Sequence, residues 1–134
     1  MAETMKLQVV TPDKEFYKGE VSMVELNTAD GEMGIYPLHV PTAVAVAPGV
    51  LKIHVGGEVR KAALLSGFIQ VLPEKMTILA ESCEWPEEID GVRANEARIR
   101  AERRLTDNSS ETDLARAEAA LQRALVRLSL TEEK

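Results

Sequence analysis

The strongest constraint on this chain is that its aromatic and arginine residues occupy different halves. All five aromatic residues precede residue 86, and eight of the nine arginines follow residue 90. Most of the glycine also belongs to the first half. Aromatic packing and glycine turns favour a β fold, whereas alanine and arginine favour helices. We therefore expect two modules with different roles, residues 1–84 and residues 85–134.

The first half is predicted to be a compact β module. Apolar and polar residues alternate in short segments that are separated by glycine, proline and aspartate turns. The clearest case is residues 51–55, followed by the pair Gly56-Gly57 and a second apolar run over residues 59–65, which predicts a hairpin. Short strands at this spacing predict a flattened antiparallel β-sandwich or barrel of about ten strands at most.

The second half is predicted to be an antiparallel two-helix hairpin. Two stripes of small and apolar residues recur at helical spacing on either side of a turn over residues 106–110, with Ser110 as the expected N-cap. Because each buried methyl contributes only about 0.8 kcal/mol, an alanine seam predicts a weakly self-stabilised, movable hairpin. The two stripes are Ala94, Ala97, Ala101 and Leu105, and Leu114, Ala117, Leu121, Ala124 and Leu128.

The segment IDGVRA, residues 89–94, stands at the junction of the two modules. Asp90 and Arg93 lie three residues apart, so a helix beginning here places them on one face. Asp90 as a helix N-cap, or an Asp90–Arg93 ion pair, explains the spacing on its own. The alternative is a ligand site at the joint, with Glu84 just upstream.

Each predicted helix also carries an arginine stripe, with successive spacings of seven and four residues. One interpretation is a solvated face with salt bridges to Glu96, Glu102 and Glu118, each worth under about 1 kcal/mol. The other is an anion site or a basic ridge for an acidic partner, because guanidinium groups match phosphate and carboxylate geometry. The stripes are Arg93, Arg100 and Arg104, and Arg116, Arg123 and Arg127.

Several function classes are disfavoured. The net charge of −6 argues against bulk binding to nucleic acid or anionic lipid. No apolar run is long enough to cross a bilayer, no signal peptide is expected, and the single cysteine, Cys83, fits a reducing compartment. His39 has no metal-ligating neighbours at a suitable spacing, and nucleotide-loop and serine–histidine motifs are missing. We expect no catalysis by this chain alone and a cytoplasmic location.

Four segments, in order along nearly the whole chain, resemble the epsilon subunit of bacterial F-type ATP synthase. They are VVTPDKEFYKGEV (9–21), DGEMGIYPLHVP (30–41), LLSGFIQVLPEKMTILAE (64–81) and IDGVRANEARIRAERRL (89–105). The resemblance implies a ten-stranded β-sandwich followed by a helical hairpin. It also implies a non-catalytic rotor subunit, peripheral at the cytoplasmic face of the membrane, that couples the central stalk to a proton- or sodium-translocating ring.

The resemblance assigns partners to the β module. This module is expected to bind the gamma subunit and to rest on the ring of c subunits. Glu32 and His39 match the acid and histidine that face the ring loops in the family. The family's usual glycine before that histidine is Leu38 here.

The resemblance also assigns a regulatory ligand to the hairpin. The segment IDGVRA matches the family's ATP-recognition pattern, so ATP, with or without Mg²⁺, is expected to hold the hairpin folded without being hydrolysed. In the extended state, Arg116, Arg123 and Arg127 are expected to meet the catalytic beta subunit, beside alpha, and inhibit ATP hydrolysis. The expected ATP-binding residues are Glu84, Ile89, Asp90, Arg93, Ala94, Arg100, Arg123 and Arg127.

Two other functions remain open at this point. The Asp90 and Arg93 pattern alone also fits a free-standing ATP-sensing module. The arginine stripes could serve a nucleic-acid-binding module, although the acidic net charge and the lack of aromatic residues after Trp85 argue against it.

Overall fold

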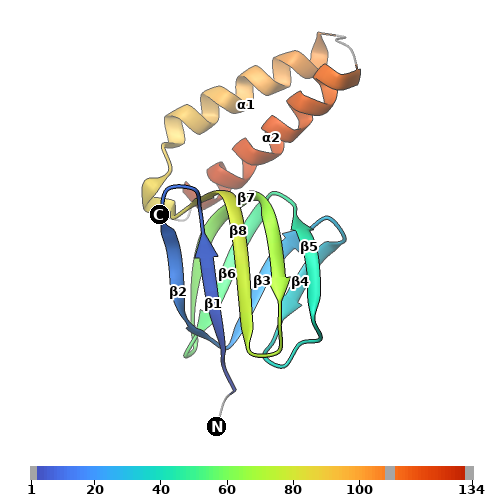
Figure 1. Cartoon of the computed structure of the whole chain (residues 1–134). Helices are drawn as coiled ribbons and strands as arrows, with labels where there is room; N and C mark the ends of the chain where they lie inside the picture. The colour runs from blue at the N-terminus through green and yellow to red at the C-terminus, as the bar shows by residue number, and fades with distance from the viewer. Residues whose placement is uncertain (1–2, 108–110, 132–134) are drawn as a thin grey trace. The chain divides into compact units, whose positions relative to one another are not determined.

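The computed structural model describes residues 3–107 and 111–131. The chain divides into two compact units, Met1–Glu84 and Trp85–Lys134. Figure 1 shows the order of elements, with all the described strands in the first unit and all the described helices in the second.

Eight strands make up the described part of the first unit, and they pair mostly with antiparallel neighbours. The strands are β1 (Met5–Val10), β2 (Glu15–Val21), β3 (Met23–Thr28), β4 (Gly31–Ile35), β5 (Thr42–Val46), β6 (Gly49–Val55), β7 (Glu58–Val71) and β8 (Lys75–Glu84).

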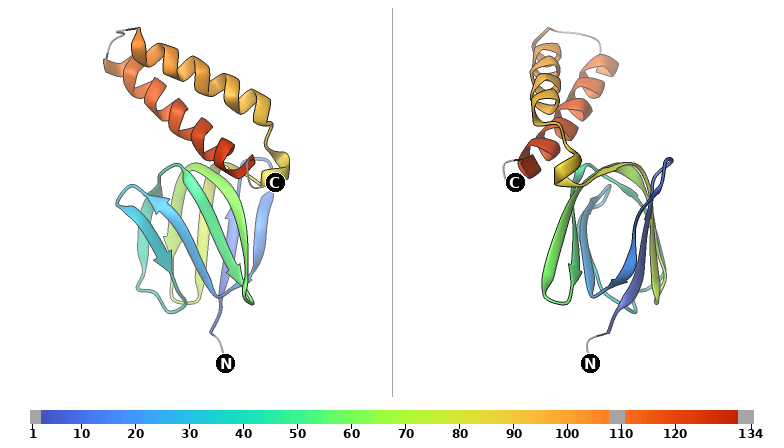
Figure 2. Two further views of the ribbon diagram at one scale, coloured as in Figure 1. Left: turned by 180° about the vertical axis from the view of Figure 1, so that it is seen from behind. Right: turned by 90° about the vertical axis from the view of Figure 1, so that its left-hand side faces the viewer.

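The strands form two layers that are joined through β7. The first part of β7 pairs with β6, which continues to β3 and β4. The last part of β7 pairs with β5, and β8 links it to β1 and β2. The right-hand view of Figure 2 shows the layers edge-on. The predicted β-sandwich is therefore confirmed.

The eight described strands fall within the expected limit of about ten, and one pairing departs from the expected antiparallel direction. The described residues contain eight continuous strands, because β7 runs for 14 residues and passes through irregularities at Ser66 and Gly67 instead of ending there. Such bulges bend a strand without breaking its pairing, so one strand serves both layers. The first and last strands, β1 and β8, pair in parallel, which local alternation does not reveal.

The core follows the alternation of the strands. In β6, Leu51 and Ile53 are buried while Lys52 is only half-buried, and β1 shows the same pattern. Buried side chains from both layers face each other and stabilise the sandwich by removing apolar area from water. The predicted hairpin between β6 and β7 is confirmed, with positive φ at both Gly56 and Gly57 as a tight hairpin turn requires.

The second unit is a short 3₁₀ turn, η1 (Pro86–Glu88), followed by α1 (Gly91–Thr106) and α2 (Glu111–Thr131). The helices lie side by side in antiparallel directions in every view of Figures 1 and 2, so the predicted hairpin is confirmed. The expected Ser110 cap lies outside the described residues. Neither described helix combines the length and apolarity that a bilayer crossing requires.

Small side chains form the seam between the helices. Ala94 and Ala101 on α1 and Ala117 and Ala124 on α2 are all buried. Because alanine methyl groups are short, the two helix backbones approach closely and the longer flanking side chains are left at the rim. The alanine stripes of the sequence therefore mark the helix contact, as expected from their spacing.

Candidate functional site

The two helices form a groove of about 300 Å³ that is lined only by alanine and arginine. We call this the arginine groove. Its lining residues are Ala97, Arg100, Ala101 and Arg104 from α1 and Ala120, Arg123, Ala124 and Arg127 from α2.

Helical spacing explains the composition of the groove. Arg100 and Arg104 are four residues apart, and so are Arg123 and Arg127, so each pair shares one helix face. Each pair flanks the alanine seam, whose buried Ala101 and Ala124 lie in the groove lining. The structure thus brings four guanidinium groups from two helices into one concave surface.

No acidic side chain is among the residues that line the groove. Within the described part of the chain, the guanidinium groups of Arg100, Arg104 and Arg123 form no hydrogen bond or ion pair. The expected salt bridges from the arginine stripes to acidic neighbours are therefore wrong for these three residues. The anion site at these arginines stays a prediction.

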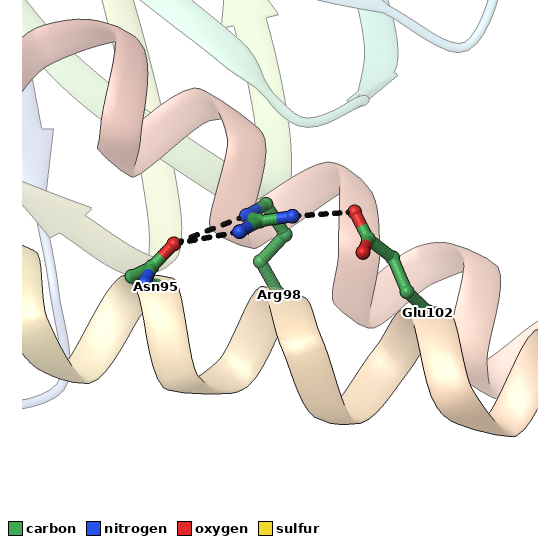
Figure 3. Close-up of polar contacts among 3 residues, drawn as sticks. All are labelled: Asn95, Arg98 and Glu102. Carbon is green, nitrogen blue, oxygen red and sulfur yellow. Dashed lines mark hydrogen bonds and ion pairs between the residues drawn. The ribbon is translucent and has the colours of Figure 1, made fainter.

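Glu102 pairs with an arginine outside the groove. It accepts a 2.7 Å bond from Arg98, an arginine outside both stripes. The same guanidinium donates two bonds, of 2.9 and 3.1 Å, to the side-chain oxygen of Asn95, as Figure 3 shows. Arg98 is therefore satisfied within its own helix, and Glu102 is engaged away from the groove arginines.

The segment IDGVRA forms the start of α1. Asp90 is the N-cap, and its Oδ1 accepts a 3.1 Å hydrogen bond from the backbone N–H of Arg93. The side chains of Asp90 and Arg93 form no ion pair with each other among the described residues. Ile89 and Ala94 are buried, whereas the side chain of Arg93 is exposed. The capping interpretation is confirmed and the ion-pair interpretation is wrong.

The structure divides the expected ATP-binding residues into separate groups. Arg100, Arg123 and Arg127 come together in the arginine groove. Arg93 precedes Arg100 by seven residues, which corresponds to roughly 10 Å along the axis of α1. Glu84 ends β8 in the first unit. The hairpin thus presents two sets of candidate residues, one at the start of α1 and one in the groove.

One groove residue, Arg104, was not among the ATP-binding residues that the resemblance implied. The sequence already indicated that Arg104 shares a helix face with Arg93 and Arg100, because the three residues follow spacings of seven and four. The tertiary structure was needed to show that Arg104 faces Arg123 and Arg127 across the seam, whereas the exposed Arg116 does not line the groove.

The expected ring-contact residues lie at opposite ends of β4. Glu32 is its second residue, and His39 lies in the loop that follows its end. His39 Nδ1 donates a 2.7 Å bond to the carbonyl oxygen of Val40. Before it, Leu38 has a φ of 66°, the left-handed conformation that glycine adopts without strain, and its N–H donates to Pro73 at 2.8 Å.

The described residues offer little to a metal ion. No three histidine, cysteine, aspartate or glutamate side chains gather there in a way that could hold one. Cys83 is buried in β8, as expected for a small apolar residue. Within the arginine groove, the polar side chains are guanidinium groups.

Comparisons with known proteins cover both units. The model for the ATP synthase delta/epsilon chain β-sandwich domain matches residues 4–86, and that for the long α-helix domain matches residues 87–132. The ATP synthase epsilon chain of Ruminiclostridium cellulolyticum is 42% identical over 98% of each chain. That of Caldicellulosiruptor bescii is 45% identical over 99% of this chain and 96% of its own.

Solved structures share the fold at lower identity. A chain of the Euglena gracilis mitochondrial ATP synthase, from a structure of OSCP, F1 and the c-ring, has a TM-score of 0.81 with 24% identity, covering 94% of this chain and 79% of its own. A chain of the Tetrahymena thermophila mitochondrial ATP synthase, from a structure of the central stalk and c-ring, has a TM-score of 0.64 with 19% identity. The match covers 98% of this chain and 96% of the Tetrahymena chain.

Proposed function

Since this chain belongs to the ATP synthase delta/epsilon chain family, we propose that it works as a regulatory rotor subunit in the central stalk of an F-type ATP synthase. The chain is a non-catalytic subunit of that complex. In the proposed arrangement the β-sandwich binds the gamma subunit and rests on the c-ring through the loops around Glu32 and His39. The subunit is then peripheral, at the cytoplasmic face of the membrane.

We propose that ATP is the regulatory ligand of the hairpin. The observation that carries this proposal is the arginine groove, where four guanidinium groups meet over an alanine seam. Like charges at close range repel each other, and alanine contacts contribute little apolar burial to oppose that repulsion. A triphosphate in the groove offsets the repulsion and bonds to both helices at once.

The expected energies are sufficient for such control. A hydrogen bond to a charged group contributes about 1.5 to 3 kcal/mol. Two or three such bonds, made only when both helices line the groove, shift the balance between folded and extended hairpins by several kcal/mol. Because the ligand acts through this preference, ATP regulates the subunit without being hydrolysed.

The start of α1 is proposed to meet the ribose and adenine end of ATP. Oδ1 of Asp90 is engaged by the N-cap bond, but Oδ2 has no hydrogen-bond partner among the described residues. Oδ2 is therefore available to a ribose hydroxyl. The exposed guanidinium of Arg93 has no partner in the described part of the chain either, and it supplies donors next to Asp90.

The extended hairpin is proposed to inhibit ATP hydrolysis. In that state Arg116, Arg123 and Arg127 lie against acidic residues of the beta subunit, next to alpha. Two of these arginines line the groove in the folded hairpin. ATP and the beta subunit therefore compete for Arg123 and Arg127, which explains how a nucleotide could relieve inhibition.

The decisive experiment titrates ATP, with and without Mg²⁺, into the full chain carrying fluorescent labels on α1 and α2. ATP should shorten the distance between the labels, and Arg123→Ala should abolish this effect. Arg103→Ala, an exposed arginine outside the groove, is the matched control. In parallel, the chain should lower ATP hydrolysis by an epsilon-depleted enzyme. ATP binding without affinity for gamma or any effect on hydrolysis would instead indicate a free-standing ATP sensor.

A further inference from the structure

The connection from β8 to α1 begins with a closed turn. In η1, the ring of Pro86 restricts φ at the first position. The side chain of Glu88 accepts a 2.9 Å bond from the backbone N–H of Trp85, and the N–H of Glu88 donates a 3.0 Å bond to the carbonyl oxygen of Trp85. The N–H of Ile89 donates a 3.2 Å bond to the carbonyl oxygen of Pro86. The turn over residues 85–89 is therefore held by bonds within itself.

The first residue of α1 is a glycine that the folded hairpin does not require. The φ of Gly91 lies outside the left-handed region, unlike that of Gly56 or Gly57. A Cβ atom at Gly91 would have the side chain of Thr131 as its nearest neighbour, at 3.7 Å, which is ordinary van der Waals contact. Alanine would therefore fit at this position, and it favours a helix more than glycine does. The glycine weakens the start of α1 although neither backbone conformation nor space demands it.

We propose that Gly91 is the pivot at which α1 changes direction when the hairpin leaves its folded state, while the turn over residues 85–89 keeps its shape. Glycine has more backbone freedom than any other residue, and hinges are typically a few positions at the ends of elements. The inference rests on the proposed function in that the hairpin has a folded and an extended state. It adds the residue at which the change takes place.

Two hydrogen bonds span the pivot. Oδ1 of Asp90 accepts a 3.1 Å bond from the N–H of Arg93, and the carbonyl oxygen of Asp90 accepts a 3.0 Å bond from the N–H of Ala94. Both bonds join the residue before Gly91 to residues after it, so a rotation at Gly91 breaks both. A ligand that contacts Asp90 and Arg93 together keeps these bonds closed. The pivot therefore lies inside the segment that is proposed to recognise the nucleotide.

The end of α2 lies beside the same glycine. Thr131 is the last residue of α2, and its side chain is the nearest neighbour of the open position at Gly91. The antiparallel course of the two helices brings the end of α2 to the start of α1 in this way. Separation of α2 from α1 therefore uncovers the pivot, which links opening of the hairpin to rotation at Gly91.

The test compares Gly91 variants of the full chain without nucleotide, by single-molecule energy transfer between a label on the sandwich and a label on α1. The unaltered chain should show two distance states. Gly91→Ala should lower the population of the second state about two- to fivefold, because alanine has less backbone freedom. Gly91→Pro should lower it about tenfold or more, since proline fixes φ and suits the first helical position. The extended conformation of Asp90 is compatible with a following proline.

Pro86→Gly is the control, because it gives the same backbone freedom to the turn instead. It should leave the two populations nearly unchanged. A single distance state in the unaltered chain would overturn the inference, and so would a change in Pro86→Gly as large as that in Gly91→Ala. Circular dichroism checks the helix content, and Gly91→Ala alone carries the test if Gly91→Pro loses helix.

The outcomes separate the pivot from the proposed function. If the Gly91 variants shift the populations and ATP has no effect on the unaltered chain, the pivot stands and ATP regulation fails. If ATP shifts the populations and the Gly91 variants match the unaltered chain, ATP regulation stands and the pivot is overturned.

Discussion

Oδ1 of Asp90 accepts a hydrogen bond from the backbone N–H of Arg93 at 3.1 Å, so these two charged residues meet through the helix backbone and not through an ion pair. The bond satisfies one of the N–H groups that the first turn of α1 leaves without a partner. Asp90 therefore has a structural role that precedes any role in binding a nucleotide.

Two substitutions at Asp90 separate these roles. Asp90→Ala removes the cap and should destabilise α1 by about 1 kcal/mol, whereas Asp90→Ser keeps a cap and should leave stability nearly unchanged. If Asp90 also contacts the ribose, both variants should bind ATP more weakly. Thermal unfolding followed by circular dichroism gives the first quantity, and calorimetry gives the second. Full ATP affinity in Asp90→Ser would restrict Asp90 to capping.

The positions of Arg104 and Arg116 predict that ligand binding and inhibition can be separated. Arg104 lines the groove, and the exposed Arg116 does not. Arg104→Gln should weaken ATP binding about tenfold and leave inhibition of hydrolysis in place at zero ATP. Arg116→Gln should relieve inhibition and retain ATP affinity. Calorimetry and hydrolysis by a reconstituted enzyme measure the two effects, and parallel losses in both assays would contradict this division.

Leu38 is predicted to be strained. Its φ of 66° places a non-glycine residue in the left-handed region, and its side chain is 63% exposed, so little packing offsets the strain. Leu38→Gly should stabilise the chain by about 0.5 to 1 kcal/mol, after allowing for the greater freedom of glycine in the unfolded state.

Leu38→Ala is the control, because alanine keeps the strain while it removes the exposed side chain. It should give no gain in chemical denaturation. If Leu38→Ala and Leu38→Gly stabilised the chain equally, the destabilising feature of Leu38 would be its exposed apolar side chain and not its backbone conformation.

Gly67 is predicted to be indispensable to the bend of β7. Its φ is 147°, and a Cβ atom at this position would overlap the carbonyl oxygen of Leu79 on β8. Gly67→Ala should therefore cost more than about 2 kcal/mol in chemical denaturation. Gly57→Ala is a matched control, because Gly57 also has a positive φ but no neighbouring atom would contact its Cβ. The free energy of unfolding should fall less in Gly57→Ala than in Gly67→Ala. If both variants lost similar stability, the cost would come from the positive φ alone and not from the overlap with Leu79.

Local patterns predicted the elements of this fold well. Alternation marked buried residues such as Leu51 and Ile53, the pair Gly56-Gly57 marked the hairpin, and alanine spacing marked the helix seam. These features depend on neighbours within a few residues, so the sequence contains their full signal. The parallel pairing of β1 with β8 joins residues about 70 positions apart, and no local pattern specifies it.

The candidate site shows the same division. By itself, the sequence determined that arginines recur on one face of each helix, because a helix repeats every 3.6 residues. It left open whether those faces meet acids, solvent or each other. Only the packing of α1 against α2 decided that Arg100 and Arg104 share a groove with Arg123 and Arg127, because small alanines allow that close contact. Glu102 pairs with Arg98, four residues before it, which helical spacing allows, and only side-chain geometry decided that Arg98 and not another arginine takes this contact.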